Sequence, residues 1–438
     1  MSHAARSDVD AALDAAKGLI KEDEIVDLAL ALGNLDSPTG SEGAASDYVF
    51  EWLEQSGFQP RRVALLPERA NVVARVRGTG EGQSLLFNSH LDTTIAREEV
   101  LTTPRADARE YHEAWREGNR LIGNGIVNNK GVMSTWMVAC KALGDAGVQL
   151  QGELVMTMVV GEIGVEPVDE FQSPEYLAKE AGARFLVNRG VTADYGVVAE
   201  GTSFGLCWVE AGKAFFKVSV LGDEPPLYTP YLPRPTSIAG SPNAIVRATA
   251  VIAAIEQWAE RYEREHTYRC EGGTVVPKVS VNAIRSGVPY KITKTPSICE
   301  LYVDTRITPE QDVRGVEREL RAVLDETGIP TIVEPFAFRR GYEAPAQDVQ
   351  PLVDHVEAAH DRIFGGRPGR PIEAITSMWR DSNVFIEAGI PTVVYGPGAS
   401  VGGGNFAMEI DDLVRAAHVY AALAIEVCGV ASLGADQP

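Results

Sequence analysis

The chain has 438 residues, more than one ordinary domain holds, so two domains are expected. Its 40 Lys and Arg residues against 61 Asp and Glu residues give a net charge of −21, which argues against binding to nucleic acid or to an anionic membrane surface. With 45% hydrophobic and 23% charged residues, the composition is that of a globular protein rather than of a disordered chain.

Residues 1–24 alternate small apolar and charged residues, as an amphipathic helix does, and they lack the apolar centre of a signal peptide. No apolar run approaches the roughly 20 residues that span a bilayer. The 5 cysteines are dispersed and show no CxxC spacing, which is typical of reduced thiols. These features predict a cytoplasmic protein.

Short apolar runs alternate with helical patterns over the first 210 residues. The runs at 84–87, 153–160 and 195–199 predict buried strands, because they are rich in aliphatic residues and too short for core helices. A helix is predicted over 131–143. This alternation indicates an α/β domain with a mostly parallel sheet.

The pattern changes after about residue 212 and returns to the α/β type near residue 340. Strands are predicted at 213–221, 278–284, 297–306 and 331–335, and helices over 244–265 and 310–327. Their order is the split βαβ pattern of a compact α+β domain. A further strand at 391–396 and a closing helix at 411–428 complete the first domain. The predicted organisation is therefore a catalytic domain in two parts, 1–211 and 338–438, with an inserted lid or dimerisation domain at 212–337.

Polar residues follow three of the predicted strands of the larger domain. His90 and Asp92 follow the first strand, Glu162 the second and Glu200 the third. Each one alone is typical of an ordinary loop or core position. The carboxyl ends of parallel strands meet at one edge of a sheet, however, so these side chains are expected to converge. A histidine nitrogen and carboxylate oxygens suit zinc or manganese, and Asp92 is placed to support His90 as metal-ligand histidines are commonly supported.

Motif order and spacing along nearly the whole chain resemble the aminoacylase/carboxypeptidase family of dinuclear zinc hydrolases. The matching segments are His90-Leu-Asp92, Gly123–Gly131, Gly161-Glu162-Ile-Gly164, Glu200-Gly-Thr202 and Asn405-Phe-Ala-Met-Glu409. The resemblance implies a metal-dependent hydrolase with a lid domain through which two chains pair as a homodimer or a larger homo-oligomer.

Several positions depart from the family pattern. The family's metal-bridging Asp falls on Asn128, its late histidine on Asn405 and its general-base Glu on Gly161, and no lid histidine follows Gly222. Fewer carboxylates would leave two divalent ions poorly balanced in charge. We therefore expect one labile divalent ion, manganese or zinc, whose candidate ligands are His90, Asn128, Glu200, Glu162 and Asn405. Glu162 is also the candidate general base, and its two roles stay open.

The resemblance also suggests how a substrate is held. Arg380 and Asp381 lie in a segment that resembles a pocket-lining segment of the family, and Tyr290 and Lys291 lie near the position of a carboxylate-binding lid residue. Either cation could pair with a carboxylate, although each could equally face solvent. A small carboxylate-bearing substrate is expected.

The altered site resembles that of family members that deaminate aromatic amines. On this basis we expect hydrolytic release of ammonia from a carboxylate-bearing aromatic, converting 5-nitroanthranilate to 5-nitrosalicylate. The first alternative is a single-metal amidase or carboxypeptidase that acts on N-acyl amino acids or small peptides. The second is a catalytically inactive binding scaffold, against which the retained His90, Glu162 and Glu200 argue.

Overall fold

The computed structural model describes residues 3–93, 103–398 and 406–433. By its internal contacts the chain divides into two compact units. The first comprises Met1–Trp208, Glu343–Ile375 and Arg380–Pro438, and the second comprises Val209–Tyr342 and Thr376–Trp379.

The first unit is built on a mixed sheet. Within the described residues it has six strands, in the spatial order β1 (Arg61–Leu66), β2 (Arg69–Val76), β7 (Leu154–Val159), β3 (Leu85–His90), β8 (Tyr195–Val198) and β15 (Thr392–Val394). The last four strands in this order are parallel to one another. β2 pairs antiparallel with β7, and β1 pairs antiparallel with β2. Every residue of these four parallel strands is buried, as expected of a sheet covered on both faces.

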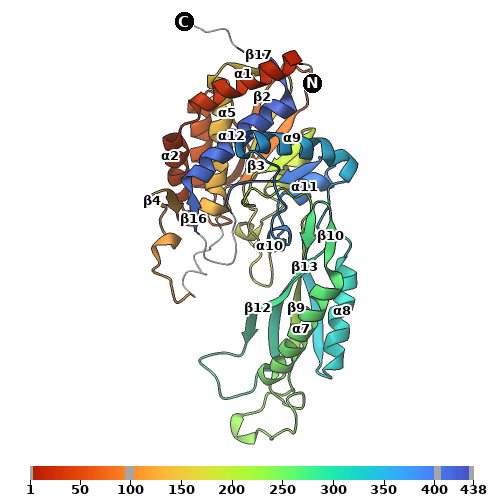
Figure 1. Ribbon diagram of the computed structural model, residues 1–438. Helices are drawn as coiled ribbons and strands as arrows, with labels where there is room; N and C mark the ends of the chain where they lie inside the picture. Colours follow the sequence, from red (N-terminus) through yellow and green to blue (C-terminus); the bar gives the residue numbers. More distant parts are fainter. Residues whose placement is uncertain (1–2, 94–102, 399–405, 434–438) are drawn as a thin grey trace. The chain divides into compact units, whose positions relative to one another are not determined.

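Helices cover this sheet (Figure 1). They are α1 (His3–Leu19), α2 (Glu22–Gly33), α3 (Gly43–Gln55), α5 (Gly131–Asp145), α6 (Ala183–Asn188), α9 (Ala346–Phe364), α11 (Ser382–Glu387) and α12 (Ile410–Cys428). The long helices α5 and α12 pack against each other and against β3, and α1 packs on both of them. On other strands, α3 contacts β2, α6 contacts β1, and α11 contacts β8 and β15.

Two small sheets extend the first unit. The strands β4 (Trp115–Glu117), β5 (Arg120–Ile122) and β16 (Ala407–Glu409) form one, and β6 (Val148–Leu150) pairs with β17 (Val430–Leu433) in the other. A short helix, α10 (Glu373–Thr376), ends where the chain enters the second unit.

The second unit is a four-stranded antiparallel sheet packed against two helices. The strand order is β12 (Val279–Ser286), β13 (Ile298–Ile307), β9 (Gly212–Leu221) and β14 (Thr331–Arg339). Its helices are α7 (Ala244–His266) and α8 (Val313–Glu326), and a small hairpin joins β10 (Tyr268–Cys270) to β11 (Gly273–Val275).

Local sequence explains both helices of the second unit. Asn243 accepts a hydrogen bond from the Ile245 amide at the start of α7, and Asp312 accepts one from the Gly315 amide at the start of α8. Such caps satisfy amides that have no partner within the helix. Apolar side chains of both helices and alternate residues of the sheet form the core of this unit.

The fold prediction is confirmed in class: a mostly parallel α/β unit is interrupted by an α+β unit with the split βαβ order. The strand predicted at 84–87 in fact continues as β3 to His90, because His90 still pairs with Val159 of β7. The second unit also takes in Thr376–Trp379, since the Ala211 amide donates to the Thr376 carbonyl and the Val276 amide donates to Ser377 Oγ. Among the described residues, no helix is both long and apolar enough to cross a membrane.

Candidate metal centre

His90 ends β3 and is fully buried. Its Nδ1 atom lies 2.9 Å from the Asp92 carbonyl oxygen and 3.3 Å from Asp92 Oδ1. Burial lowers the pKa of His90, but the hydrogen bond to Asp92 and the charges of Asp92, Glu162 and Glu200 outweigh it and raise the pKa to about 10. The surroundings of this imidazole therefore favour a positive charge strongly.

Asp92 is fixed from several sides. Its Oδ1 atom accepts a hydrogen bond from the Glu162 amide, and its Oδ2 atom accepts from the Ile163 amide and from Thr39 Oγ1. Burial raises the pKa of Asp92, but its contact with His90 and the hydrogen bond from Thr39 outweigh burial. The pKa is therefore lowered below its usual value, and the carboxyl stays ionised. A carboxylate held in this way orients the His90 ring and leaves Nε2 pointing away from it.

Two glutamates face Nε2 of His90. Glu162 follows β7 and Glu200 follows β8, and both are buried. Glu162 Oε2 lies 3.9 Å and Glu200 Oε1 lies 4.0 Å from His90 Nε2. One ligand atom of each of the three residues lies within 4.8 Å of the other two. The parallel order of β7, β3 and β8 brings them together, as strand-end convergence predicts.

Asn128 is a fourth neighbour of His90. It lies in the segment η2 (Ile126–Lys130) that precedes α5, and its own backbone is not helical, with φ −126° and ψ 86°. Its Oδ1 atom lies 3.2 Å from His90 Nε2, and the neighbouring Asn129 accepts a hydrogen bond from the His90 amide through its own Oδ1. One imidazole nitrogen, two carboxylates and an amide oxygen form a donor set that fits zinc or manganese. The residues present therefore fit a divalent ion.

Each of the two carboxylates also contacts a buried cation. Lys179 Nζ lies 2.8 Å from Glu162 Oε1, and Arg380 Nε donates to Glu200 Oε2 at 2.7 Å. The guanidinium of Arg380 also donates from Nη1 to the Ile375 carbonyl. Sequence reasoning missed Lys179, because it lies in an irregular segment between β7 and α6 where no periodic pattern marks it.

The predicted substrate residues fall in different places. Arg380 and Asp381 are buried in the first unit, where Asn88 Nδ2 donates to Asp381 Oδ2. Burial, reinforced by the charge of Glu162, raises the pKa of Asp381 to about 7. Tyr290 and Lys291 are exposed in the second unit. Asn405 lies outside the described residues. Contact of any of these residues with a substrate stays a prediction.

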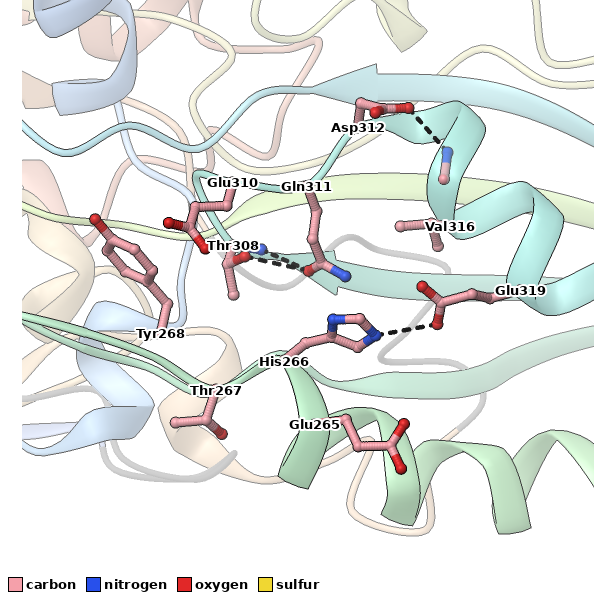
Figure 2. A pocket seen from close by; sticks show the side chains of 11 residues that line it. Glu265, His266, Thr267, Tyr268, Thr308, Glu310, Gln311, Asp312, Val316 and Glu319 are labelled. Carbon is pink, nitrogen blue, oxygen red and sulfur yellow. Dashed lines mark hydrogen bonds and ion pairs between the residues drawn. The ribbon is translucent and has the colours of Figure 1, made fainter.

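A separate cavity of about 350 Å³ lies within the second unit, between the end of α7 and the start of α8 (Figure 2). His266 Nε2 lies 3.1 Å from Glu319 there, and several further carboxylates line the space. Gln311 is held by the amide and hydroxyl of Thr308. Figure 2 shows His266 and Glu319 pointing toward each other, with Gln311 and Thr308 paired beside them.

Comparison with known sequences settles the family. Residues 86–426 match the sequence model of Peptidase family M20/M25/M40. The chain belongs to this family. The three converging residues, His90, Glu162 and Glu200, are therefore the candidate metal centre of this M20-family hydrolase.

Relatives of this M20 chain span most of its length. N-formyl-4-amino-5-aminomethyl-2-methylpyrimidine deformylase of Bacillus subtilis is 23% identical, with 86% of this chain and 88% of the relative covered. Acetylornithine deacetylase of Vibrio parahaemolyticus is 24% identical, with 83% and 85% covered. The solved structure of the YXEP protein of Bacillus subtilis, a dinuclear metal-binding M20 peptidase, has a TM-score of 0.59 at 14% identity and covers 93% of this chain and 98% of its own.

Proposed function

We propose that this chain hydrolyses the amide bond of a small N-acylated amine, such as an N-formyl or N-acetyl compound, with a divalent ion at His90, Glu162 and Glu200. The observation that supports this most directly is the buried cluster of three ligand atoms within 4.8 Å of one another. Two family relatives are named for removing a formyl or an acetyl group from nitrogen, which favours amide hydrolysis.

The chain's own residues would position and retain the ion. A bound divalent ion supplies Lewis acidity toward an amide carbonyl and makes water more acidic. Asp92 fixes the His90 ring so that Nε2 faces Glu162 and Glu200. Burial of the cluster excludes bulk water and strengthens its electrostatic effect on a substrate.

Proton transfer needs a carboxyl close to the ion. Glu162 directs Oε2 toward His90 Nε2 and holds Lys179 with Oε1, an arrangement that favours its role as a ligand over its role as a free base. Asp381 is a further buried carboxyl of this region and interacts electrostatically with Glu162 and Glu200. We propose Asp381 as the proton carrier, which accepts a proton from water and passes it to the leaving amine.

This proposal differs from the main expectation of the sequence analysis. The loss of family residues predicts ammonia release from 5-nitroanthranilate, but neither relative is named for such a reaction. The amidase alternative is better supported. The inactive scaffold is disfavoured because the donors at the ends of three strands are retained and converge.

A substrate panel tests the proposal. Metal-loaded protein is incubated with N-formyl and N-acetyl amines, N-acetyl amino acids and 5-nitroanthranilate, and formate, acetate and ammonia are measured. We expect formate or acetate release that stops on chelation and in Glu200→Gln. Ammonia from 5-nitroanthranilate without any deacylation would instead establish the deaminase. No product from folded, metal-loaded protein would favour the binding scaffold.

A further inference from the structure

The two ligand carboxylates share one arrangement. Glu162 turns Oε2 toward His90 Nε2 and binds Lys179 with Oε1, at 2.8 Å. Glu200 turns Oε1 toward His90 Nε2 and binds Arg380 with Oε2, at 2.7 Å. In each case one oxygen faces the shared ligand position, while the other is taken by a protein cation.

The positive charges of Lys179 and Arg380 neutralise the two ligand carboxylates within the protein. The four side chains of these two pairs are buried, with side-chain exposures of 4–6%. Two carboxylates and two protein cations balance each other before any ion enters. A second divalent ion at Glu162 would meet the ammonium group of Lys179 at short range, and like charges repel strongly where water is excluded. The nearby Asn128 brings no compensating charge.

The position of Lys179 is built into the backbone. Gly161 has a φ of +67°, a conformation that favours glycine. A Cβ atom at this position would lie 2.4 Å from the Ala178 carbonyl oxygen. The absence of a side chain at Gly161 therefore lets the Ala178–Lys179 segment lie against the backbone just before Glu162. A glutamate at Gly161 and the present course of this segment exclude each other.

We propose that Lys179 is a positioning residue that replaces a second divalent ion. Its ammonium group binds Glu162 Oε1, so this oxygen is not available to a second ion. The chain therefore holds one ion where a dinuclear relative holds two. The charge of Lys179 also acts on Asp92 and Asp381, so it supplies positive charge to the surrounding carboxyls as well. The inference rests on the proposed function only in that both need a divalent ion at this cluster.

Ion counting on the full chain tests this inference without any substrate. Manganese or zinc is titrated into wild type, Lys179→Arg, Lys179→Met and Lys179→Gln, and bound ions are counted by calorimetry and native mass spectrometry. Melting curves identify the variants that fold. Arginine keeps the charge and is the matched control, and methionine and glutamine are two independent neutral replacements.

We expect one ion per chain in wild type and in Lys179→Arg. Each folded neutral variant should gain a second ion, or bind ions about tenfold more tightly or better, because a repelling charge is gone. Two ions in wild type would overturn the inference, as would neutral variants that bind one ion with wild-type affinity. Since the readout is ion number, a failed substrate panel leaves this result intact and refutes only the proposed reaction.

Discussion

The Asp92 carboxylate supports the candidate metal ligand His90 from the side of the ring opposite Glu162 and Glu200. The Asp92 carboxylate lies 3.3 Å from His90 Nδ1 and accepts hydrogen bonds from two backbone amides and from Thr39. Replacement of such a supporting carboxylate typically weakens metal binding by about 10- to 100-fold. We predict a loss of this size in Asp92→Asn, measured by calorimetric titration of manganese.

A matched control separates support of His90 from general loosening of the site. Thr39→Val removes a single hydrogen bond to Asp92 Oδ2 and leaves the His90 contact in place. It should weaken manganese binding much less than Asp92→Asn does. Equal affinities in wild type and Asp92→Asn would show that the charge of the Asp92 carboxylate is not needed to orient His90.

Residue-level prediction worked where local sequence reports position in the fold. His90, Glu162 and Glu200 each follow an apolar run, and the geometry of a parallel sheet brings such residues together. The sequence around Lys179 and Arg380 did not indicate which carboxylates these two residues contact. Their partners lie 17 and 180 residues away in the chain, and only the folded loops show which carboxylate each one meets.

At the level of elements, three histidines make the packing of α9 and α12 sensitive to acid. Burial lowers the pKa of His355 and His360 on α9 and of His418 on α12, each from 6.5. These groups bind protons more readily in the unfolded chain. The stability that comes from keeping them neutral is therefore fully present above about pH 6.5 and is lost as the pH falls below it.

We predict that the free energy of unfolding falls less in the double variant His355→Gln/His418→Gln than in wild type when the pH is lowered from about 7 to about 5. Urea unfolding of both proteins across this range measures the difference. The comparison cancels the contributions of His90 and Asp381, which both proteins share. Parallel curves for the two proteins would mean that the histidines do not destabilise the fold in acid.

Element prediction succeeded in order and type and was least accurate at boundaries. β3 runs on through Asn88 and Ser89 because parallel pairing with β7 continues past the apolar run. Thr376–Trp379 join the second unit through hydrogen bonds with Ala211 and Val276 that no local pattern encodes. Periodicity reports which face of an element is buried, and pairing between distant segments decides where the element ends.

At the scale of the whole molecule, the second unit offers an edge strand for self-association. Most of β12 is exposed, whereas β14 contains Pro335 and its Val333 carbonyl accepts a hydrogen bond from Arg321. Proline and blocked carbonyls discourage strand pairing. We therefore propose that β12, rather than β14, pairs two chains into a homodimer.

Substitution at each edge tests this assembly. Ile284 on β12 and Ile332 on β14 are exposed to similar extents, 55% and 48%. We predict that Ile284→Lys shifts the protein toward monomer in size-exclusion chromatography with light scattering. Ile332→Lys should keep the mass of the wild type. A wild-type monomer, or equal behaviour of the two variants, would rule out pairing through β12.

We propose that one divalent ion binds at the carboxyl ends of β3, β7 and β8. The most direct test is a crystal of the full chain grown with manganese, with diffraction data collected to locate the metal by its anomalous signal. We expect one peak per chain, within coordination distance of His90 Nε2, Glu162 and Glu200. A peak elsewhere, two peaks at this site, or none in a crystal equilibrated with saturating manganese would contradict it.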